Sequence, residues 1–283
     1  MRFRYVVIFS ILSFFLLSPL FGQAVNVRDF NEALTSGNVT LESANGTGYI
    51  STVTGRLRNN TRNEIQINVS ITNGLYFVNS GAGQNMIAVA VYLEGNRFYR
   101  SGTIRYIILP ANTTTNIIFV SLCADREKDA PKTNELLIRT NMPSNLQSIA
   151  TRLSNYYAAN YGTAVNEPIQ LALWREQRES ISDIAAIYNF TAEDWTTSSN
   201  ILGLPPPPID PIPAGTYSYS SRYSVTINGN NFTMNWEDSI YRGTYIRIDN
   251  AIILKATSGD YKGVFTIVNN GIQDRDGDLW RRR

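Results

Sequence analysis

The sequence predicts a mainly β protein: an N-terminal antiparallel β-sandwich with a helical segment, followed by a small all-β meander or barrel. Three observations support this fold class. Residues 25–142 contain short segments in which apolar and polar residues alternate, residues 143–203 change to helical periodicity, and residues 215–283 return to short alternating segments between turn residues. A proline-rich linker at 204–214, with six of the chain's 11 prolines, separates the last two regions.

The N-terminus has the three-part form of a secretory signal peptide, which we place at residues 1–24. Arg2 and Arg4 precede an apolar run over residues 6–21, and Gly22 and Ala24 provide the small residues of a cleavage site. The alternative is a retained anchor, but the run is shorter than the ~20 residues of a spanning helix. We therefore expect an exported protein, in the periplasm or on the cell surface, with no membrane span after cleavage.

Composition restricts the possible chemistry. The chain has no histidine and one cysteine, which excludes Ser-His-Asp triads, imidazole metal sites and an internal disulfide framework. Without Arg2 and Arg4, the remaining 23 basic side chains equal the 23 acidic ones. Because binding to phosphates requires an excess of basic residues, we expect no nucleic-acid partner. The sequence indicates no cofactor.

The first region is predicted to be an antiparallel sandwich because its short strands are separated by turn residues. Residues 65–71 alternate strictly between apolar and polar, and Asn73 with Gly74 forms a turn signal. Residues 86–93 form a longer apolar run. Further strands are expected at 75–78, 104–109 and 117–122.

Residues 143–203 are predicted to be helices packed on the sandwich. Ser144 and Gln147 have capping-box spacing ahead of the first helix, which Gly162 ends. A second helix is expected to begin near Pro168. A short pair follows at 181–188 and 191–195, the latter with a second capping box from Thr191 to Asp194.

The linker and the last region are predicted to form a spacer and a meander. A run of prolines is extended and semi-rigid, so residues 204–214 are expected to space two units apart; the alternative is a docking ligand for an aromatic groove. After it, Gly215-Thr216-Tyr217 recurs 28 residues later as Gly243-Thr244-Tyr245. About six short strands are expected. The region resembles the small C-terminal meander domains of exported bacterial proteins, which end in a Gly-Asp-x-Trp motif, as residues 277–280 do.

Two motifs carry the main chemical hypothesis. Cys123 ends a predicted strand and is followed by Pro131, and Gln170 lies in an apolar-Gln-x-Ala-apolar-Trp helix start. Together they resemble the thioester domains of bacterial surface adhesins. The resemblance implies that Cys123 is the thiol and Gln170 the acyl donor of an internal thioester, formed with loss of ammonia, that reacts with amines on a host ligand. Such chemistry requires proximity and exclusion of water.

The chain departs from that family in two respects. The interval of 47 residues between Cys123 and Gln170 is short, and Leu122 replaces the usual aromatic residue before the cysteine. Exported bacterial sandwich proteins of unknown role match equally well. The alternatives are a buried structural Cys123 and an ordinary amphipathic helix start at Gln170. The sequence leaves open whether the two residues are adjacent.

Two acidic groups are weaker candidates. Asp274, Asp276 and Asp278 suggest a calcium loop, but the glycine precedes the third aspartate and no distal glutamate follows, so a polar hairpin turn is preferred. Glu193 and Asp194 could act as a hydrolase pair, but helix capping explains them better.

We therefore expect an exported, non-catalytic envelope or surface protein with a binding or structural role, whose partner is an unknown protein or glycan. The second hypothesis is a covalent adhesin that uses a Cys123–Gln170 thioester. A hydrolase built on carboxylates ranks last.

Overall fold

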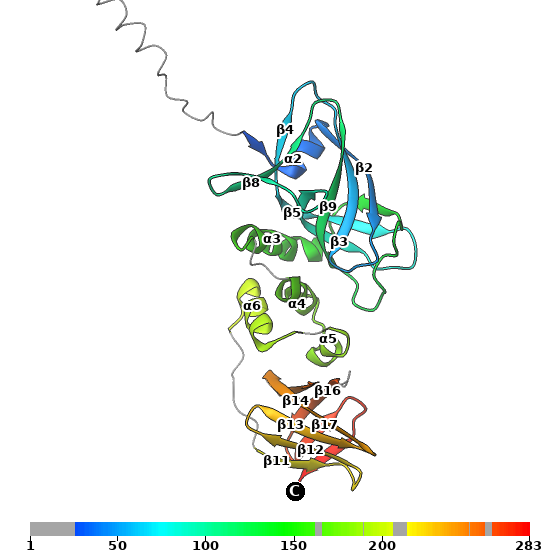
Figure 1. The fold of residues 1–283 in the computed structure, drawn as a ribbon, viewed down its shortest axis with the longest axis vertical. Helices are drawn as coiled ribbons and strands as arrows, with labels where there is room; N and C mark the ends of the chain where they lie inside the picture. Colours follow the sequence, from blue (N-terminus) through cyan, green and yellow to red (C-terminus); the bar gives the residue numbers. More distant parts are fainter. Residues whose placement is uncertain (1–25, 162–165, 189, 206–213, 249, 258–261) are drawn as a thin grey trace, which may run out of the picture.

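The computed structural model describes residues 26–161, 166–188, 190–205, 214–248, 250–257 and 262–283. It is mainly β, with 47% strand and 20% helix, which confirms the predicted fold class. The sandwich, a layer of helices and a barrel follow one another along the long axis (Figure 1). The expected signal peptide, Gly162 and most of the linker lie outside the described residues. No helix within the described ranges is long and apolar enough to span a bilayer.

The sandwich consists of a four-stranded and a six-stranded sheet. Their strand orders are β1-β4-β8-β7 and β10-β5-β6-β9-β3-β2, and all neighbours are antiparallel except β1 and β4. The short helix α2 (Phe30–Thr35) packs against the sheets. The strands are β1 Val27–Arg28, β2 Val39–Gly46, β3 Thr52–Asn59, β4 Ile65–Asn68, β5 Ser70–Asn79, β6 Met86–Leu93, β7 Tyr99–Ser101, β8 Ile104–Leu109, β9 Thr114–Cys123 and β10 Leu137–Thr140.

Strand β6 shows why its sequence is a continuous apolar run. Met86 and Ala88 face the core between the two sheets. Ile87 and Val89 face the opposite side of the sheet, where they pack with helix residues. A strand that is covered on both faces needs apolar residues at every position, not at every second one.

Helices α3 (Ser144–Ala159) and α4 (Asn166–Glu176) pack on the outer face of the six-stranded sheet, and α5 (Ile181–Ile187) and α6 (Ala192–Leu202) lie between them and the barrel (Figure 1). The capping box predicted at Ser144 is wrong, because Pro143 occupies the N-cap and makes no side-chain cap. The Gln147 amide instead donates to the Met142 carbonyl. The box from Thr191 to Asp194 is confirmed.

The C-terminal region is a closed barrel of eight strands, in which each strand pairs with its sequence neighbours and β11 pairs with β18. The expected number of about six is wrong, because strands of four residues, such as β17 and β18, contain too few alternations to be recognised. At Gly243 a Cβ atom would lie 1.9 Å from the Lys255 carbonyl oxygen, so the close approach of β14 and β15 requires glycine. The strands are β11 Gly215–Ser218, β12 Tyr223–Asn228, β13 Asn231–Trp236, β14 Ser239–Ile248, β15 Ala251–Ala256, β16 Lys262–Val268, β17 Gly271–Asp274 and β18 Leu279–Arg282.

The barrel packs directly on the helices. Strands β15 and β16 contact α5, and β14 contacts α6. Ile184 and Trp195 from the helices share one apolar cluster with Ile248 and Ile253 from the barrel. The barrel is therefore docked on the helical layer, whereas the sequence predicted a unit held apart by a stiff spacer.

Candidate functional site

The candidate site is the junction of β9 with α4, and it brings Cys123 and Gln170 together. The Cys123 N–H donates to Gln170 Oε1 at 2.8 Å, and Gln170 Nε2 donates to the Cys123 carbonyl oxygen at 3.0 Å. Trp174 Nε1 donates to the same carbonyl oxygen at 3.1 Å. Gln170 and Trp174 lie on the same side of α4, because they are four residues apart and four residues make about one helical turn. The site is buried, with Gln170 at 2% and Trp174 at 3% exposure.

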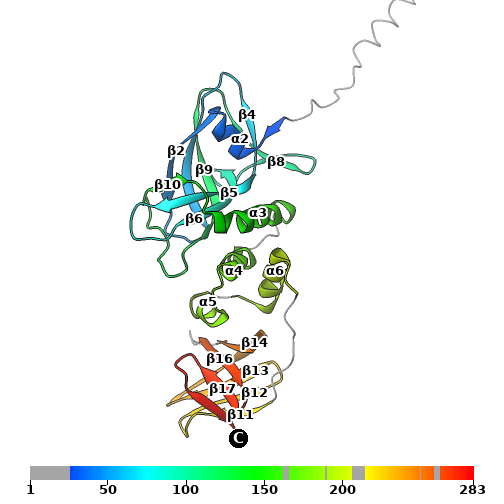
Figure 2. The ribbon, with the colours of Figure 1, turned by 180° about the vertical axis from the view of Figure 1, so that it is seen from behind.

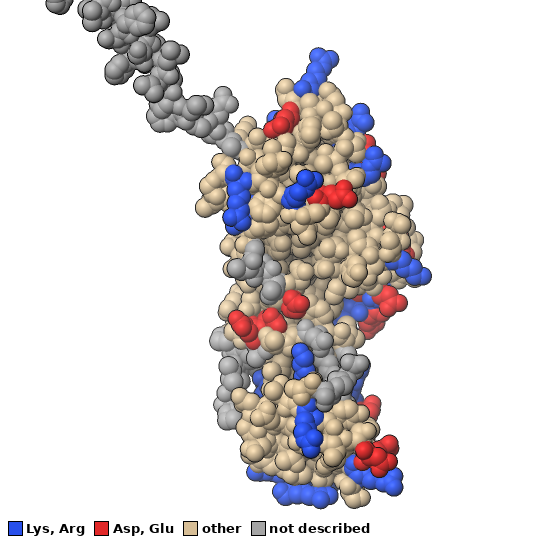
Figure 3. Space-filling model, viewed as in Figure 1, with Lys and Arg blue, Asp and Glu red and all other residues tan. Residues whose placement is uncertain are grey.

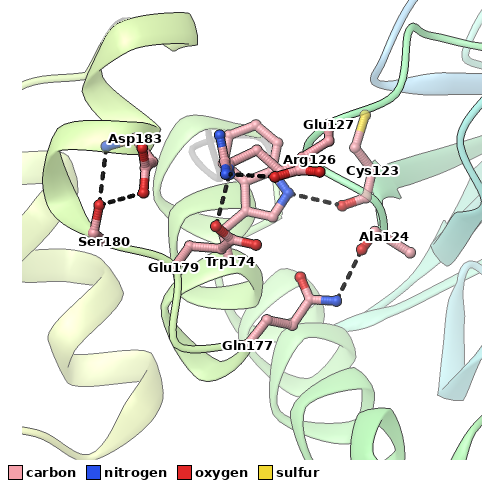
Figure 4. Close-up of polar contacts among 9 residues, drawn as sticks. All are labelled: Cys123, Ala124, Arg126, Glu127, Trp174, Gln177, Glu179, Ser180 and Asp183. Atoms are coloured by element: carbon pink, nitrogen blue, oxygen red, sulfur yellow. Dashed lines mark hydrogen bonds and ion pairs between the residues drawn. The ribbon is translucent and has the colours of Figure 1, made fainter.

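Gln177, directly after the last residue of α4, also contacts the end of β9. Its Nε2 donates to the Ala124 carbonyl oxygen at 2.8 Å. Figure 4 shows Trp174 and Gln177 reaching from the helix to the end of the strand. Gln170 and Trp174 of α4, with Gln177 just after it, therefore satisfy backbone groups at and directly after the end of β9.

The Cys123 thiol points away from these contacts. In Figure 4 the sulfur lies on the opposite side of the residue from Trp174. Its Sγ lies 3.6 Å from the carbonyl oxygen of Ile50. Burial, and then the nearby Asp125 carboxylate, raise the pKa of the Cys123 thiol well above its ordinary value. The thiol is therefore a weak nucleophile in this conformation.

Gln84 is a site residue that the sequence analysis missed. Its side-chain amide faces the Cys123 thiol and lowers the pKa of that thiol, against the larger effects of burial and Asp125. The residue is 3% exposed, and its Oε1 has no hydrogen-bond partner among the described residues. It lies in the glycine-bearing segment before β6, and a glutamine in such a segment gives no signal of burial in the sequence. The side-chain amide that contacts the sulfur is thus Gln84, while Gln170 contacts the main chain.

Charged side chains beside the site pair with one another. Arg126 Nε lies 2.7 Å from Glu179 Oε2, and its Nη2 lies 3.3 Å from Glu127 Oε1. Asp125 Oδ2 accepts from the Asn85 N–H and from Lys128 Nζ, both at 3.0 Å. Over the face shown in Figure 3, charges of both signs lie singly or in small groups. The site therefore has no field of one sign that would stabilise a thiolate.

The weak calcium candidates form a hairpin between β17 and β18. Asp274 Oδ1 accepts from the backbone N–H groups of Asp276 and Asp278, at 3.1 and 2.8 Å. Its Oδ2 accepts from Trp280 Nε1 at 2.9 Å. Across the described part of the chain, no group of three or more His, Cys, Asp or Glu is placed to hold a metal ion. Asp274 fixes the turn and the buried tryptophan.

The two carboxylates at the start of α6, Glu193 and Asp194, have different environments. Asp194 Oδ2 accepts from the Thr191 N–H at 2.7 Å and from the Thr191 hydroxyl at 2.8 Å. Glu193 is exposed on the first turn of the helix. Asp194 thus completes the capping box, as the preferred interpretation of the sequence predicted.

Comparison of the chain with known protein families, with characterised proteins and with solved structures found no match.

Proposed function

We propose that the protein is an exported envelope or surface protein that acts without catalysis, by binding a partner or contributing structure. The observation that carries this proposal is the bonding of Gln170. Both polar atoms of its amide are hydrogen-bonded to the main chain of Cys123. The hydrogen bonds between Gln170 and Cys123 therefore join α4 to the sandwich. Helices α5 and α6 in turn contact the barrel.

We call these two hydrogen bonds between Gln170 and the Cys123 main chain the clamp. Through it the sandwich, the helices and the barrel form one continuous, ordered structure. Leu171 and Trp174 of α4 belong to the apolar cluster that also contains Ile248 of the barrel. A rigid arrangement lowers the entropy cost of binding, because the surfaces are ordered before the partner arrives. This favours a binding or structural role over an electrostatically steered reaction.

A Cys123–Gln170 thioester is the second candidate, and the proximity of the two residues favours it. The Cys123 sulfur would attack the Gln170 amide carbon, forming the S–C bond, while the C–N bond breaks and ammonia leaves with the thiol proton. In the described conformation the amide is bonded to the main chain, and the sulfur contacts Ile50 and Gln84. The reaction would require Cys123 and Gln170 to exchange these contacts.

Intact mass spectrometry of the protein exported from a bacterial host separates the two candidates. The binding proposal predicts cleavage after Ala24, the full calculated mass of residues 25–283, and one thiol that reacts only after denaturation. A mass lower by one ammonia, restored by methylamine and absent in Cys123→Ala, would establish the thioester instead. Gln170→Ala and Gln84→Ala serve as a matched pair, because only the true acyl donor would abolish the mass loss. An uncleaved protein in the cytoplasm would overturn export.

A further inference from the structure

The six-stranded sheet of the sandwich is nearly closed, and its two edge strands, β2 and β10, lie on the same side of the molecule (Figure 2). They are joined at one end only. The Gly46 N–H donates to the Glu135 carbonyl at 2.8 Å, the Asn134 N–H donates to the Gly46 carbonyl at 2.9 Å, and Asn45 bridges Leu136. We call the remaining gap, between residues 39–44 and 137–140, the open seam.

The two strands that border the open seam are not hydrogen-bonded to each other along it. Within these described segments, no backbone hydrogen bond joins residues 39–44 to residues 137–140. The register of β2 against β3 shifts between Leu41 and Ser43, which leaves Glu42 as an extra residue. Such a bulge bends and twists its strand, and it lies in the part of β2 before Ala44, which is not bonded to β10. Each strand is thereby left with one edge facing a gap instead of a neighbour.

The open seam has the shape and lining of a site for an extended strand. It is a groove of about 440 Å³. Its floor is apolar: Val39 and Leu137 are 1% and 2% exposed and belong to the core between the sheets. Residues 39–44 span about 20 Å in an extended conformation, enough to pair with a strand of similar length.

The rim of the open seam carries apolar and basic side chains. Leu136 and Ile138 are 49% and 50% exposed. Arg56 and Arg58 share Glu42, at 3.7 and 4.0 Å, and both arginine side chains are more than half exposed. Arg139 lines the groove from β10 and makes no ion pair with any described residue. Arg56, Arg58 and Arg139 thus outnumber the one glutamate, Glu42, and the rim is basic.

We propose that the open seam binds an extended segment of a partner polypeptide, with apolar side chains directed inward and acidic side chains directed outward. Main-chain hydrogen bonds to β2 and β10 would supply the affinity, and alternate side chains the specificity. Because β2 and β10 run antiparallel to each other, the inserted segment is parallel to one and antiparallel to the other. The inference deepens the proposed binding function and rests on it.

The test uses the whole mature chain and a fluorescent peptide of about eight alternating glutamate and valine residues. We expect saturable binding by fluorescence anisotropy and slowed amide exchange in residues 39–44 and 137–140 together. A lysine–valine peptide should bind more weakly, and a glutamate–valine peptide with central prolines should not bind. Absence of binding, or protection confined to other strands, would overturn the proposal.

A charge-reversal pair sharpens the test. Arg139→Glu should weaken binding of the acidic peptide by up to about fivefold and improve binding of the basic one, since an exposed charge pair contributes about 1 kcal/mol or less. Arg275→Glu, an exposed arginine on the barrel, is the control and should change neither. Equal effects of the two variants would exclude the open seam.

Two further outcomes separate this inference from the proposed function. Sedimentation velocity of the chain without peptide should show a monomer; concentration-dependent self-association that protects the same two strands would assign the open seam to a second copy and overturn a partner segment. Binding of isolated envelope glycans that Arg139→Glu leaves unchanged, with no peptide binding, would preserve the proposed function and reject the open seam.

Discussion

In the barrel every strand pairs with its neighbour in sequence, and β18 returns to β11, whereas in the six-stranded sheet the order β10-β5-β6-β9-β3-β2 leaves two edges. Hairpins of short sequence separation build the barrel, and its two edges are removed by the pairing of β11 with β18, as of Tyr217 with Arg282. The sandwich depends on pairs that are distant in sequence, such as Thr52 with Val120, and on a helix that covers the end of β9. The comparison teaches that a sheet closes only when its two end strands pair along their length, and that a sheet whose end strands meet at one end only keeps two edges.

Trp280→Ala should destabilise the closed barrel, and we expect it to have the largest effect on stability. Trp280 is 1% exposed, packs in the barrel core and donates to Asp274 beside the closing strand. We expect a loss of about 3–5 kcal/mol in the free energy of unfolding, measured by urea denaturation with near-UV circular dichroism. The half-exposed Trp236→Ala should cost about 1 kcal/mol or less.

The same variant shows whether the barrel is independent of the sandwich. If the barrel core is separate, Cys123 stays unreactive toward a thiol reagent while the barrel unfolds. Simultaneous exposure of Cys123 would show that the shared apolar cluster makes the two regions one cooperative unit.

Gln170→Ala should weaken the contact between α4 and the sandwich, and we expect an intermediate effect on stability. It leaves the buried Cys123 N–H without its acceptor, which costs about 1–3 kcal/mol. We expect faster labelling of the Cys123 thiol and an unchanged barrel signal. Gln147→Ala, on the exposed surface of α3, is the control. Equal stability of the two variants would contradict the clamp assigned to Gln170.

The smallest expected effect is the pH dependence contributed by Cys123. Because burial raises the thiol pKa in the folded state, the native thiol stays protonated while the unfolded thiol ionises near pH 8.5. The associated stability is fully present below that pH and is lost as the pH rises through and beyond it, by at most about 1.4 kcal/mol per pH unit. Urea unfolding between pH 7 and about 9.5 should show a shallower decline in Cys123→Ala. Parallel declines would mean that the thiol is not shielded in the native state.

Much of the site was visible in the sequence, for a local reason. A cysteine at the end of an apolar run and a glutamine at a helix start mark the ends of two elements, and the structure places those ends together. Gln84 was missed because its burial depends on how the residues before β6 fold over the end of β9. The open seam was missed because it arises from strand order and a bulge, which alternation does not encode.

The sequence by itself determined the mainly β class, the helical segment, the all-β C-terminal region and the capping box at Thr191. Each follows from side-chain periodicity or a short-range hydrogen bond. The tertiary structure alone decided which faces of β6 are covered, that the barrel docks on α5 and α6, that Gln170 bonds the Cys123 main chain, and that the described residues 39–44 of β2 share no backbone hydrogen bond with β10. These features depend on contacts between residues far apart in the chain, where packing and hydrogen-bond satisfaction select among arrangements of equal local quality.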